Sequence, residues 1–364
     1  MDELRIAVLA PPWIEVPAPA YGGIEEVVRL EVDGLVARGH DVTLFAPPGS
    51  DTPARAAAPL SDTHPDEIER CVWEVDHVAR AFDAIDQELP GGRRFDVVHD
   101  HCGFAGLAFA GRLRTPFVHT MHGPLDEATL PFYATHAPKG TVVAISHAQL
   151  DGAPPALEGA PVVHNPLAFA EWKLETDPGE HVLWIGRMNP VKGPHRAIAA
   201  AREAGVPLVL AGPVQPGQER FFAAEVEPHV DGEAVHYVGE TGGADKAELY
   251  RSAAALLMPI RWREPFGLVM VEAMACGTPV IAFAEGSVPE VVEDGVSGFV
   301  VDDEHAMAAA IGRAVELDRA AVRASACERF DVERCVEGYE RVFRGAVAGR
   351  SDNRRGRFMR IASR

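Results

Sequence analysis

Hydrophobic positions fall into two kinds of run along this chain. Short continuous apolar runs, typical of buried strands, alternate with longer segments in which apolar residues recur every three or four positions, typical of amphipathic helices. The first three such segments are a strand at residues 4–10, a helix at 24–38 and a strand at 41–46. Strand, helix and strand in quick succession form a βαβ unit, which predicts a parallel sheet.

The alternation continues through the first half of the chain and restarts after a break. An irregular loop is expected at 47–65, and then a helix over 66–88 that carries Ile68, Val72, Val75, Val78 and Phe82 on one face. A polar stretch with Pro and Gly at 166–180 is the best linker candidate. The other strands expected are 95–99, 116–120, 141–145, 161–164, 181–185, 207–211, 234–238, 255–258 and 280–283.

Helices are expected between the strands of the second half, at 194–203, 218–226 and 246–253, and from about 266 to Gly277. Two successive open α/β halves predict two domains, residues 1–168 and 169–331, with a ligand cleft at the carboxyl ends of their strands. A last helix is predicted from 332, with apolar residues at Cys335, Tyr339, Val342 and Phe343.

Two carboxylates interrupt the most apolar part of the second half, residues 258–283. Glu264 precedes the predicted helix start at Phe266–Gly267, and Glu272 lies inside that helix among apolar neighbours. A buried carboxylate without a partner costs several kcal/mol, so something polar must meet Glu272. For Glu264, an ion pair with Arg261 or Arg263 is a simpler explanation than a functional role. The backbone N–H groups of Phe266, Gly267 and Leu268 would form an anion site at the helix start.

Two cations and two glycines occupy similar loops at strand ends. Arg187 and Lys192 lie in a glycine-bounded loop after the strand 181–185, where they would suit a diphosphate. Gly22 and Gly23 precede the first helix, where backbone amides could approach a phosphate. The simpler explanations are two solvated surface cations and an ordinary tight turn.

His122 follows the strand 116–120 and could bind a substrate hydroxyl or stabilise developing charge. Asp100 and His101 follow the strand 95–99 and carry the same ambiguity. A satisfied polar residue is the ordinary explanation for each of the three. Their place at strand ends is what favours a functional role.

Composition and missing motifs remove several function classes. The net charge of −20 argues against nucleic-acid binding, which needs basic surface. The five cysteines lack C-x-x-C spacing and indicate a reduced, cytoplasmic protein, and no apolar run is long enough to span a membrane. The fingerprints G-x-G-x-x-G, G-x-x-x-x-G-K-[ST], D-x-D, H-E-x-x-H and G-x-S-x-G are absent, so we expect neither a metal nor another cofactor.

These residues together resemble family 4 of the retaining nucleotide-sugar glycosyltransferases. Residues 264–272 match the E-x₇-E motif of that family, and the similar segments extend over nearly the whole chain, in the expected order. Finer detail resembles a bacterial subgroup that includes an antibiotic-biosynthesis glycosyltransferase of the avilamycin type. The similarity to the subgroup is carried by residues 120–126, 192–195, 261–267 and 286–290. The similarity to the family as a whole is carried, besides 264–272, by Gly22-Gly23, Asn165-Pro166, Gly186-Arg187, Lys192-Gly193, Gly212-Pro213, 273–280, 289–292 and 294–299.

The resemblance implies the GT-B fold, two Rossmann-like domains that face each other across a cleft. Residues 1–168 would bind the acceptor, 169–331 would bind the nucleotide sugar, and the helix 332–364 would pack back on the first domain. Many members carry Gly-Gly where this chain has Glu285-Gly286. That difference puts close backbone approach at this point in question.

The resemblance also implies a role for each candidate residue. Arg187 and Lys192 would bind the donor diphosphate, with amides of Gly23 and of residues 266–268. Glu272 would bind the ribose, Glu264 would face the donor sugar, and His122 would lie beside the anomeric centre. The backbone at Val238-Gly239 would contact the base.

The expected reaction is retaining, metal-independent transfer of a sugar from a nucleoside diphosphate to a hydroxyl acceptor, such as a saccharide, an antibiotic or a glycolipid precursor. The alternatives are a nucleotide-sugar 2-epimerase and a non-catalytic sugar-nucleotide sensor. The tail 349–364 carries six arginines. Two interpretations of this tail remain: weak contact with an anionic membrane surface, and a solvated, disordered end.

Overall fold

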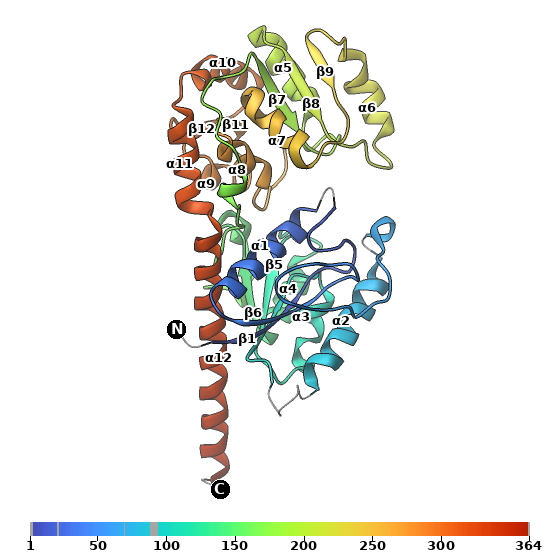
Figure 1. Cartoon of the computed structure of the whole chain (residues 1–364), viewed down its shortest axis with the longest axis vertical. Helices are drawn as coiled ribbons and strands as arrows, with labels where there is room; N and C mark the ends of the chain where they lie inside the picture. Colours follow the sequence, from blue (N-terminus) through green and yellow to red (C-terminus); the bar gives the residue numbers. More distant parts are fainter. Residues whose placement is uncertain (1–2, 20–21, 69, 88–93, 363–364) are drawn as a thin grey trace. The chain divides into compact units, whose positions relative to one another are not determined.

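A computed structural model describes residues 3–19, 22–68, 70–87 and 94–362. The chain forms two compact units, residues 1–166 with 332–364, and residues 167–331. Each unit is built on one parallel sheet with helices beside it (Figure 1). Among the described residues, no helix combines the length and the apolar character that crossing a membrane would require.

The sheet of the first unit has the strand order β3-β2-β1-β4-β5-β6, with every neighbouring pair parallel. In this order the chain runs outward from β1 in one direction and then restarts beside β1 with β4. Its elements are β1 (Arg5–Leu9), α1 (Gly23–Ala37), β2 (Asp41–Phe45), β3 (Arg55–Ala57), α2 (Cys71–Asp86), β4 (Val97–Asp100), α3 (Ala105–Phe109), β5 (Phe117–Met121), α4 (Leu130–His136), β6 (Thr141–Ala144) and α12 (Val332–Ala362).

The sheet of the second unit repeats that arrangement as β12-β11-β10-β7-β8-β9. The topological switch point therefore lies between β7 and β10, and ligands of open α/β sheets bind at such a point, outside the carboxyl ends of the strands. Its elements are β7 (His181–Ile185), α5 (Pro194–Ala204), β8 (Leu208–Ala211), α6 (Glu219–Glu225), β9 (Val235–Tyr237), α7 (Gly243–Ser252), β10 (Ala253–Met258), α8 (Leu268–Ala275), β11 (Val280–Phe283), α9 (Val288–Val291), β12 (Gly298–Val301), α10 (Glu304–Val315) and α11 (Arg319–Phe330).

Both faces of the first sheet are buried, as a parallel sheet requires. Along β1, Ala7 and Leu9 belong to a core with α2, while Ile6 and Val8 belong to a core with α1 and α12. α12 lies against α1 in Figure 1 and inserts Cys335, Tyr339 and Phe343 into that second core. The end of the chain thus completes the fold of the first unit.

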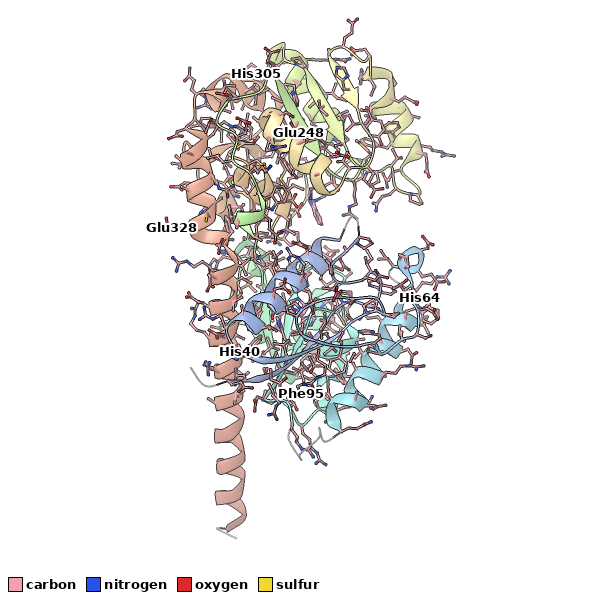
Figure 2. All side chains as sticks on the ribbon, in the orientation of Figure 1. His40, His64, Phe95, Glu248, His305 and Glu328 are labelled. Carbon is pink, nitrogen blue, oxygen red and sulfur yellow. The ribbon has the colours of Figure 1, made fainter. Side chains whose placement is uncertain are left out.

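α12 is also held by a buried polar contact near the start of the first sheet. Glu340 accepts a bond of 2.7 Å from Nε2 of His40, which is labelled in Figure 2, and pairs with Arg38 at 2.9 Å. The helix continues to Ala362, so the arginine-rich tail is helical through that residue.

Three sequence-based expectations about the first unit were wrong. Residues 47–65 include β3, a short edge strand that was expected to be loop. Residues 161–164 form a single bridge from Val162 to Ala144 in place of a strand. The apolar face expected along 66–88 is buried only at Val78 and Phe82, because its first part, Ile68, Val72 and Val75, is exposed at 50%, 60% and 37%.

Candidate donor and sugar site

The loops after β7 and β10 flank the switch point of the second sheet, and a charge pair joins them. Lys192 Nζ lies 2.5 Å from Glu264 Oε2, and the two side chains are 18% and 10% exposed. Trp262 Nε1 donates to the same carboxylate oxygen at 2.9 Å, and Lys192 Nζ lies 4.5 Å from the centre of the Trp262 ring. Two motifs that are 72 residues apart in sequence therefore meet in one site. The sequence had suggested an ion pair of Glu264 with Arg261 or Arg263, and it did not indicate Lys192 as a partner.

The loop that carries Lys192 is fixed by its own backbone. The Lys192 amide donates to Asn189 Oδ1 at 2.9 Å, and the Trp184 indole donates to the Lys192 carbonyl at 3.1 Å. Gly193 then takes φ 75° as the N-cap of α5, where a Cβ would lie 2.4 Å from the Pro259 carbonyl. The backbone around Lys192 is thereby positioned without help from its ammonium group.

Arg187 lies in the same loop, partly buried, and forms no ion pair with any residue that the structure describes. An unpaired guanidinium at the carboxyl edge of a sheet is available to an anion, for which its planar fork is suited.

The segment between the two glutamates forms the start of α8. Gly267 takes φ 78° as the N-cap, and Phe266 is buried against Phe330. The first turn of α8 contains no acidic residue. The first amides of a helix lack intrahelical acceptors, so this end carries partial positive charge.

The loop at 285–287 supports the Glu264 segment. Gly286 takes φ 55°, and a Cβ there would lie 2.4 Å from both the N and the O of Glu264. Ser287 donates its amide to the Glu264 carbonyl at 3.0 Å and its hydroxyl to the Phe266 carbonyl at 2.8 Å. Glu285 instead pairs with Arg261 at 3.3 Å. The close contact between residue 286 and the Glu264 backbone therefore depends on glycine, and the carboxylate of Glu285 leaves that contact intact.

Glu272 is met by two polar side chains, as its burial requires. Lys246 Nζ lies 2.6 Å from Oε1, and the Tyr250 hydroxyl donates to Oε2 at 2.8 Å. Sequence reasoning expected a polar partner here but did not find either one. Both come from α7, where Lys246 and Tyr250 are four residues apart and therefore share a helix face.

Val238 and Gly239 follow β9. Val238 is 47% exposed, and Gly239 takes φ 77° with open space at the position of a Cβ. The Gly212 amide donates to the Gly239 carbonyl at 2.7 Å, so this exposed turn is tied to the end of β8.

The remaining candidates belong to the first unit. Gly22 is the N-cap of α1, and its φ of −177° is a backbone conformation that any residue can adopt. A larger residue would not fit there, because a Cβ would lie 2.5 Å from Ala18 Cβ. Glu25, in the first turn of α1, is only 5% exposed, and burial raises the pKa of its carboxyl. The start of α1 thus already holds an acidic side chain, unlike the start of α8. This finding weighs against a phosphate at Gly22-Gly23.

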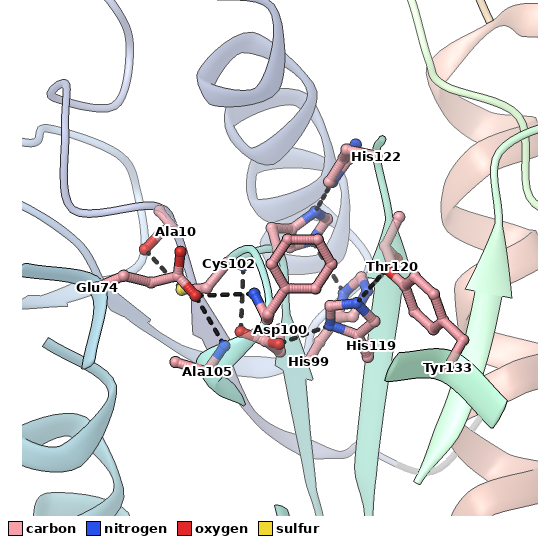
Figure 3. Close-up of polar contacts among 12 residues, drawn as sticks. Ala10, Glu74, His99, Asp100, Cys102, Ala105, His119, Thr120, His122 and Tyr133 are labelled. Atoms are coloured by element: carbon pink, nitrogen blue, oxygen red, sulfur yellow. Dashed lines mark hydrogen bonds and ion pairs between the residues drawn. The ribbon is translucent and has the colours of Figure 1, made fainter. Parts of the chain in front are cut away.

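His122 follows β5 and is partly buried. Its Nε2 lies 2.9 Å from Nδ1 of His101, which follows the neighbouring strand β4. Figure 3 shows the His122 ring turned toward this histidine cluster, and Asp100 bonded to His119 at 2.7 Å beside it. Burial lowers the pKa of His122 well below its ordinary value, and His101 adds to the effect. His122 is therefore neutral at pH 7.

One group of three side chains among the described residues has the ligand types of a metal site. Its members are Glu31, His99 and His101, all buried in the first unit, with ligand atoms within 4.8 Å of one another. Sequence analysis missed Glu31, because a single glutamate in a charged helix looks solvent-facing. The only signal for this group was the His-x-His pair at the end of β4.

Two family models and several curated proteins match this chain. Residues 169–329 match the family model described as Glycosyl transferases group 1, and residues 21–151 match Glycosyltransferase Family 4. The chain is 30% identical to a D-inositol 3-phosphate glycosyltransferase of Acidothermus cellulolyticus, over 99% of this chain and 93% of that protein. A protein of the same name from Segniliparus rotundus is 29% identical, over 95% and 90%.

Solved structures show the same fold. The chain is similar to AviGT4, a glycosyltransferase involved in avilamycin A biosynthesis, with a TM-score of 0.70, 27% identity and coverage of 95% of this chain and 98% of that one. It also matches Anabaena Alr3699/HepE, solved in complex with UDP and glucose, with a TM-score of 0.69, 20% identity and coverage of 93% and 99%.

Proposed function

This chain belongs to glycosyltransferase family 4 and is a nucleotide-sugar-dependent glycosyltransferase with the GT-B fold, and we propose that it transfers the sugar with retention of configuration and without a metal ion. The observation that carries this proposal is the Lys192–Glu264 pair beside the start of α8, at the switch point of the second unit. Cations and a helix N-terminus there supply positive charge of the kind that a metal would otherwise bring to a diphosphate.

In this proposal Lys192 and Arg187 bind the diphosphate together with the amides of residues 266–268. A lysine ammonium has three N–H donors, and only one is needed for Glu264, so the pair leaves donors for phosphate oxygens. As the leaving group departs, negative charge grows on its oxygens. The same contacts then strengthen, which lowers the barrier.

The two glutamates position the donor. Glu272 accepts one bond at each oxygen from α7, and a carboxylate has about four acceptor positions, so it can also accept the hydroxyls of a ribose diol. Glu264 faces the donor sugar in this proposal. Its Oε2 is already engaged by Lys192 and Trp262, which suits positioning better than nucleophilic attack. Attack by the acceptor on the front face, assisted by the leaving phosphate, then gives retention.

Val238-Gly239 is the proposed base platform, and His122 the proposed contact to a sugar hydroxyl from the first unit. Residues 1–168 with 332–364 are proposed to bind the acceptor, and 169–331 the donor. We assign the diphosphate to the second unit and give Gly22-Gly23 a minor part, because Glu25 occupies the start of α1. The five cysteines are all free, which supports a reducing, cytoplasmic setting.

The first experiment measures the melting temperature with UDP-, GDP-, ADP- and TDP-sugars, because a bound donor stabilises the fold by mass action. The donor that raises it is then incubated with acceptors, beginning with inositol 3-phosphate, which the name of the Acidothermus relative suggests. Product anomeric configuration by NMR tests retention, and unchanged turnover in EDTA tests metal independence. A product with inverted configuration would refute retention. A loss of activity that Mg²⁺ restores would refute metal independence.

Two outcomes would replace the proposal as a whole. An epimerised nucleotide sugar that forms without any acceptor would identify an isomerase. Tight donor binding without turnover on any acceptor would identify a sugar-nucleotide sensor.

A further inference from the structure

Trp262 contacts two of the charged residues that the proposed function assigns to the donor, and that function gives Trp262 no role of its own. Its Nε1 donates to Glu264 Oε2 at 2.9 Å, and Lys192 Nζ lies 4.5 Å from the centre of its ring. Lys192 Nζ also lies 2.5 Å from the same carboxylate oxygen. One oxygen of Glu264 therefore receives two donors, which come from two different loops.

The other oxygen of Glu264 is open. Oε1 accepts no hydrogen bond from any residue that the structure describes, and it is not sealed from solvent. A carboxylate paired with an ammonium is ionised, and an ionised carboxylate can only accept hydrogen bonds. Oε1 is therefore an acceptor that a hydroxyl group of a ligand can fill.

The backbone on both sides of Trp262 is fixed, so the indole has a defined place. The Arg261 amide donates to the Val191 carbonyl at 2.8 Å, which joins this loop to the loop that carries Lys192. The Glu264 amide donates to the Trp262 carbonyl at 2.9 Å, which closes a tight turn between the indole and the carboxylate. A tryptophan side chain has only two rotatable bonds, so on such a turn its N–H keeps one direction.

The two donors on Oε2 differ in how they respond to a diphosphate. Lys192 has a flexible stem and three N–H donors, so its ammonium can turn toward phosphate oxygens. The indole of Trp262 has a single N–H, and that N–H is already bonded to Glu264. Trp262 is therefore the contact that keeps the carboxylate in place while the lysine is shared.

We propose that Trp262 is a positioning residue for donor-sugar selectivity, because its N–H holds Oε2 of Glu264 and thereby presents Oε1 to one hydroxyl of the donor sugar. This inference rests on the proposed function for the identity of the ligand. The preferred substrates are then nucleotide sugars that carry a hydroxyl at that one position. The corresponding deoxy sugar is a poor substrate, since it leaves the acceptor without a donor.

Deoxy analogues of the donor sugar, each lacking one hydroxyl, test this selectivity. They carry the base that raises the melting temperature most. For one analogue, the wild type should lose about ten- to hundredfold in kcat/KM relative to the full sugar, because one hydrogen bond to a charged group is missing. Trp262→Phe keeps a ring beside Lys192 and removes the N–H. Its loss for the same analogue should be at least about fivefold smaller, and its affinity for the free nucleoside diphosphate should stay within about twofold of the wild type.

Trp73→Phe is the matched control, because the Trp73 indole also donates to a glutamate, Glu67, and its ring stacks on His64 with ring centres 3.7 Å apart. This group belongs to the first unit, whereas Glu264 belongs to the second. Both variants should lower the melting temperature, while only Trp262→Phe should reduce the loss caused by the deoxy analogue. An equal loss in the wild type and in Trp262→Phe would overturn the proposal. Equal weakening of the free diphosphate and of the sugar nucleotide would reduce Trp262 to a structural support.

The ¹H–¹⁵N signal of the Trp262 indole tests the contact without any nucleotide. The chain has five tryptophans, and the signal that disappears in Trp262→Phe identifies this one. A hydrogen bond to a carboxylate shifts the proton downfield, so the signal should move upfield in Glu264→Gln, while the Trp73 signal stays in place.

An unchanged Trp262 signal in Glu264→Gln would overturn the proposal. Where Trp262→Phe fails to fold, the absence of any movement among the five indole signals of Glu264→Gln has the same meaning. Because this spectrum needs no nucleotide, the contact can fail while nucleotide sugars still bind and react. The inference and the proposed function therefore fail on different results.

Discussion

The Lys192–Glu264 pair admits two explanations that a double-mutant cycle separates. Lys192 either binds the donor diphosphate or only neutralises a glutamate that is 10% exposed. Lys192→Met keeps the length of the side chain and removes its charge. Under both explanations Glu264 is left with Trp262 as its donor, so the protein is destabilised. Only under the first does transfer depend on the ammonium itself.

The two effects differ in size. An ammonium about 4 Å from a phosphate charge contributes about 4 kcal/mol at the effective dielectric constant of a site near the surface. That energy corresponds to a loss of about three powers of ten in kcat/KM. The destabilisation should be smaller, about 1–3 kcal/mol, because Glu264 keeps one hydrogen bond and some contact with water.

The assay compares wild type, Lys192→Met, Glu264→Gln and the double variant by urea unfolding and by initial rates of transfer. Glu264→Gln removes the charge that Lys192 would otherwise leave unpaired, so the double variant should recover most of the lost stability and remain about a thousandfold slower. Recovery of transfer to within tenfold of Glu264→Gln alone would refute the diphosphate assignment, because it would show that Lys192 serves only Glu264.

Three further predictions concern the supports of the fold and the site. Arg319→Met should destabilise the second unit by about 3–5 kcal/mol in urea unfolding, because the buried guanidinium donates four hydrogen bonds and its acceptors would be left unpaired; a change under 1 kcal/mol would contradict this. Gly286→Ala should slow transfer by at least about tenfold, because the new Cβ displaces Glu264. A rate equal to that of the wild type would show that the loop accommodates the Cβ without moving Glu264. Unfolding free energy should fall as the pH drops from about 6.5 to 4, because His77 and His99 have folded-state pKa values of about 4 and the unfolded chain binds the protons first; a flat profile over this window would contradict the buried neutral state.

The sequence predicted the elements best where apolar runs are bounded by turn residues. The strands that became β1, β2, β4, β5 and β7 to β11 all form close to their expected bounds. All of them except the edge strand β9, where His236 is exposed, are largely buried. β3 is short and largely exposed, so no hydrophobic signal marks it. Residues 161–164 look like a strand, but only one bridge forms there. Burial along α2 was over-predicted, since periodicity shows which residues share a face but not how far the core extends beneath it.

The candidate site could be predicted one loop at a time but not as a set of contacts. Glu264, Glu272, Arg187 and Lys192 stood out because charged residues at strand ends or in apolar runs need an explanation. Their partners could not be found in this way. The pairing of Lys192 with Glu264 depends on β7 and β10 being neighbours, and that follows from strand order, which a single sequence does not state. Glu31 was missed for the same reason, because its partners lie at the end of β4.

The two glutamates of the E-x₇-E segment share an arrangement that explains how such a site tolerates both the empty and the loaded state. Each is paired with a lysine from another element, Glu264 with Lys192 and Glu272 with Lys246. These pairs cancel charge locally, so the empty site holds no unpaired buried carboxylate. Arg187 is different, because it has no ion-pair partner among the described residues. In the proposed function, a donor diphosphate would be bound by Arg187, which has no ion-pair partner among the described residues, and by Lys192, which it would share with Glu264. That sharing would keep the carboxylate proposed to face the sugar beside the charge that develops as the diphosphate leaves.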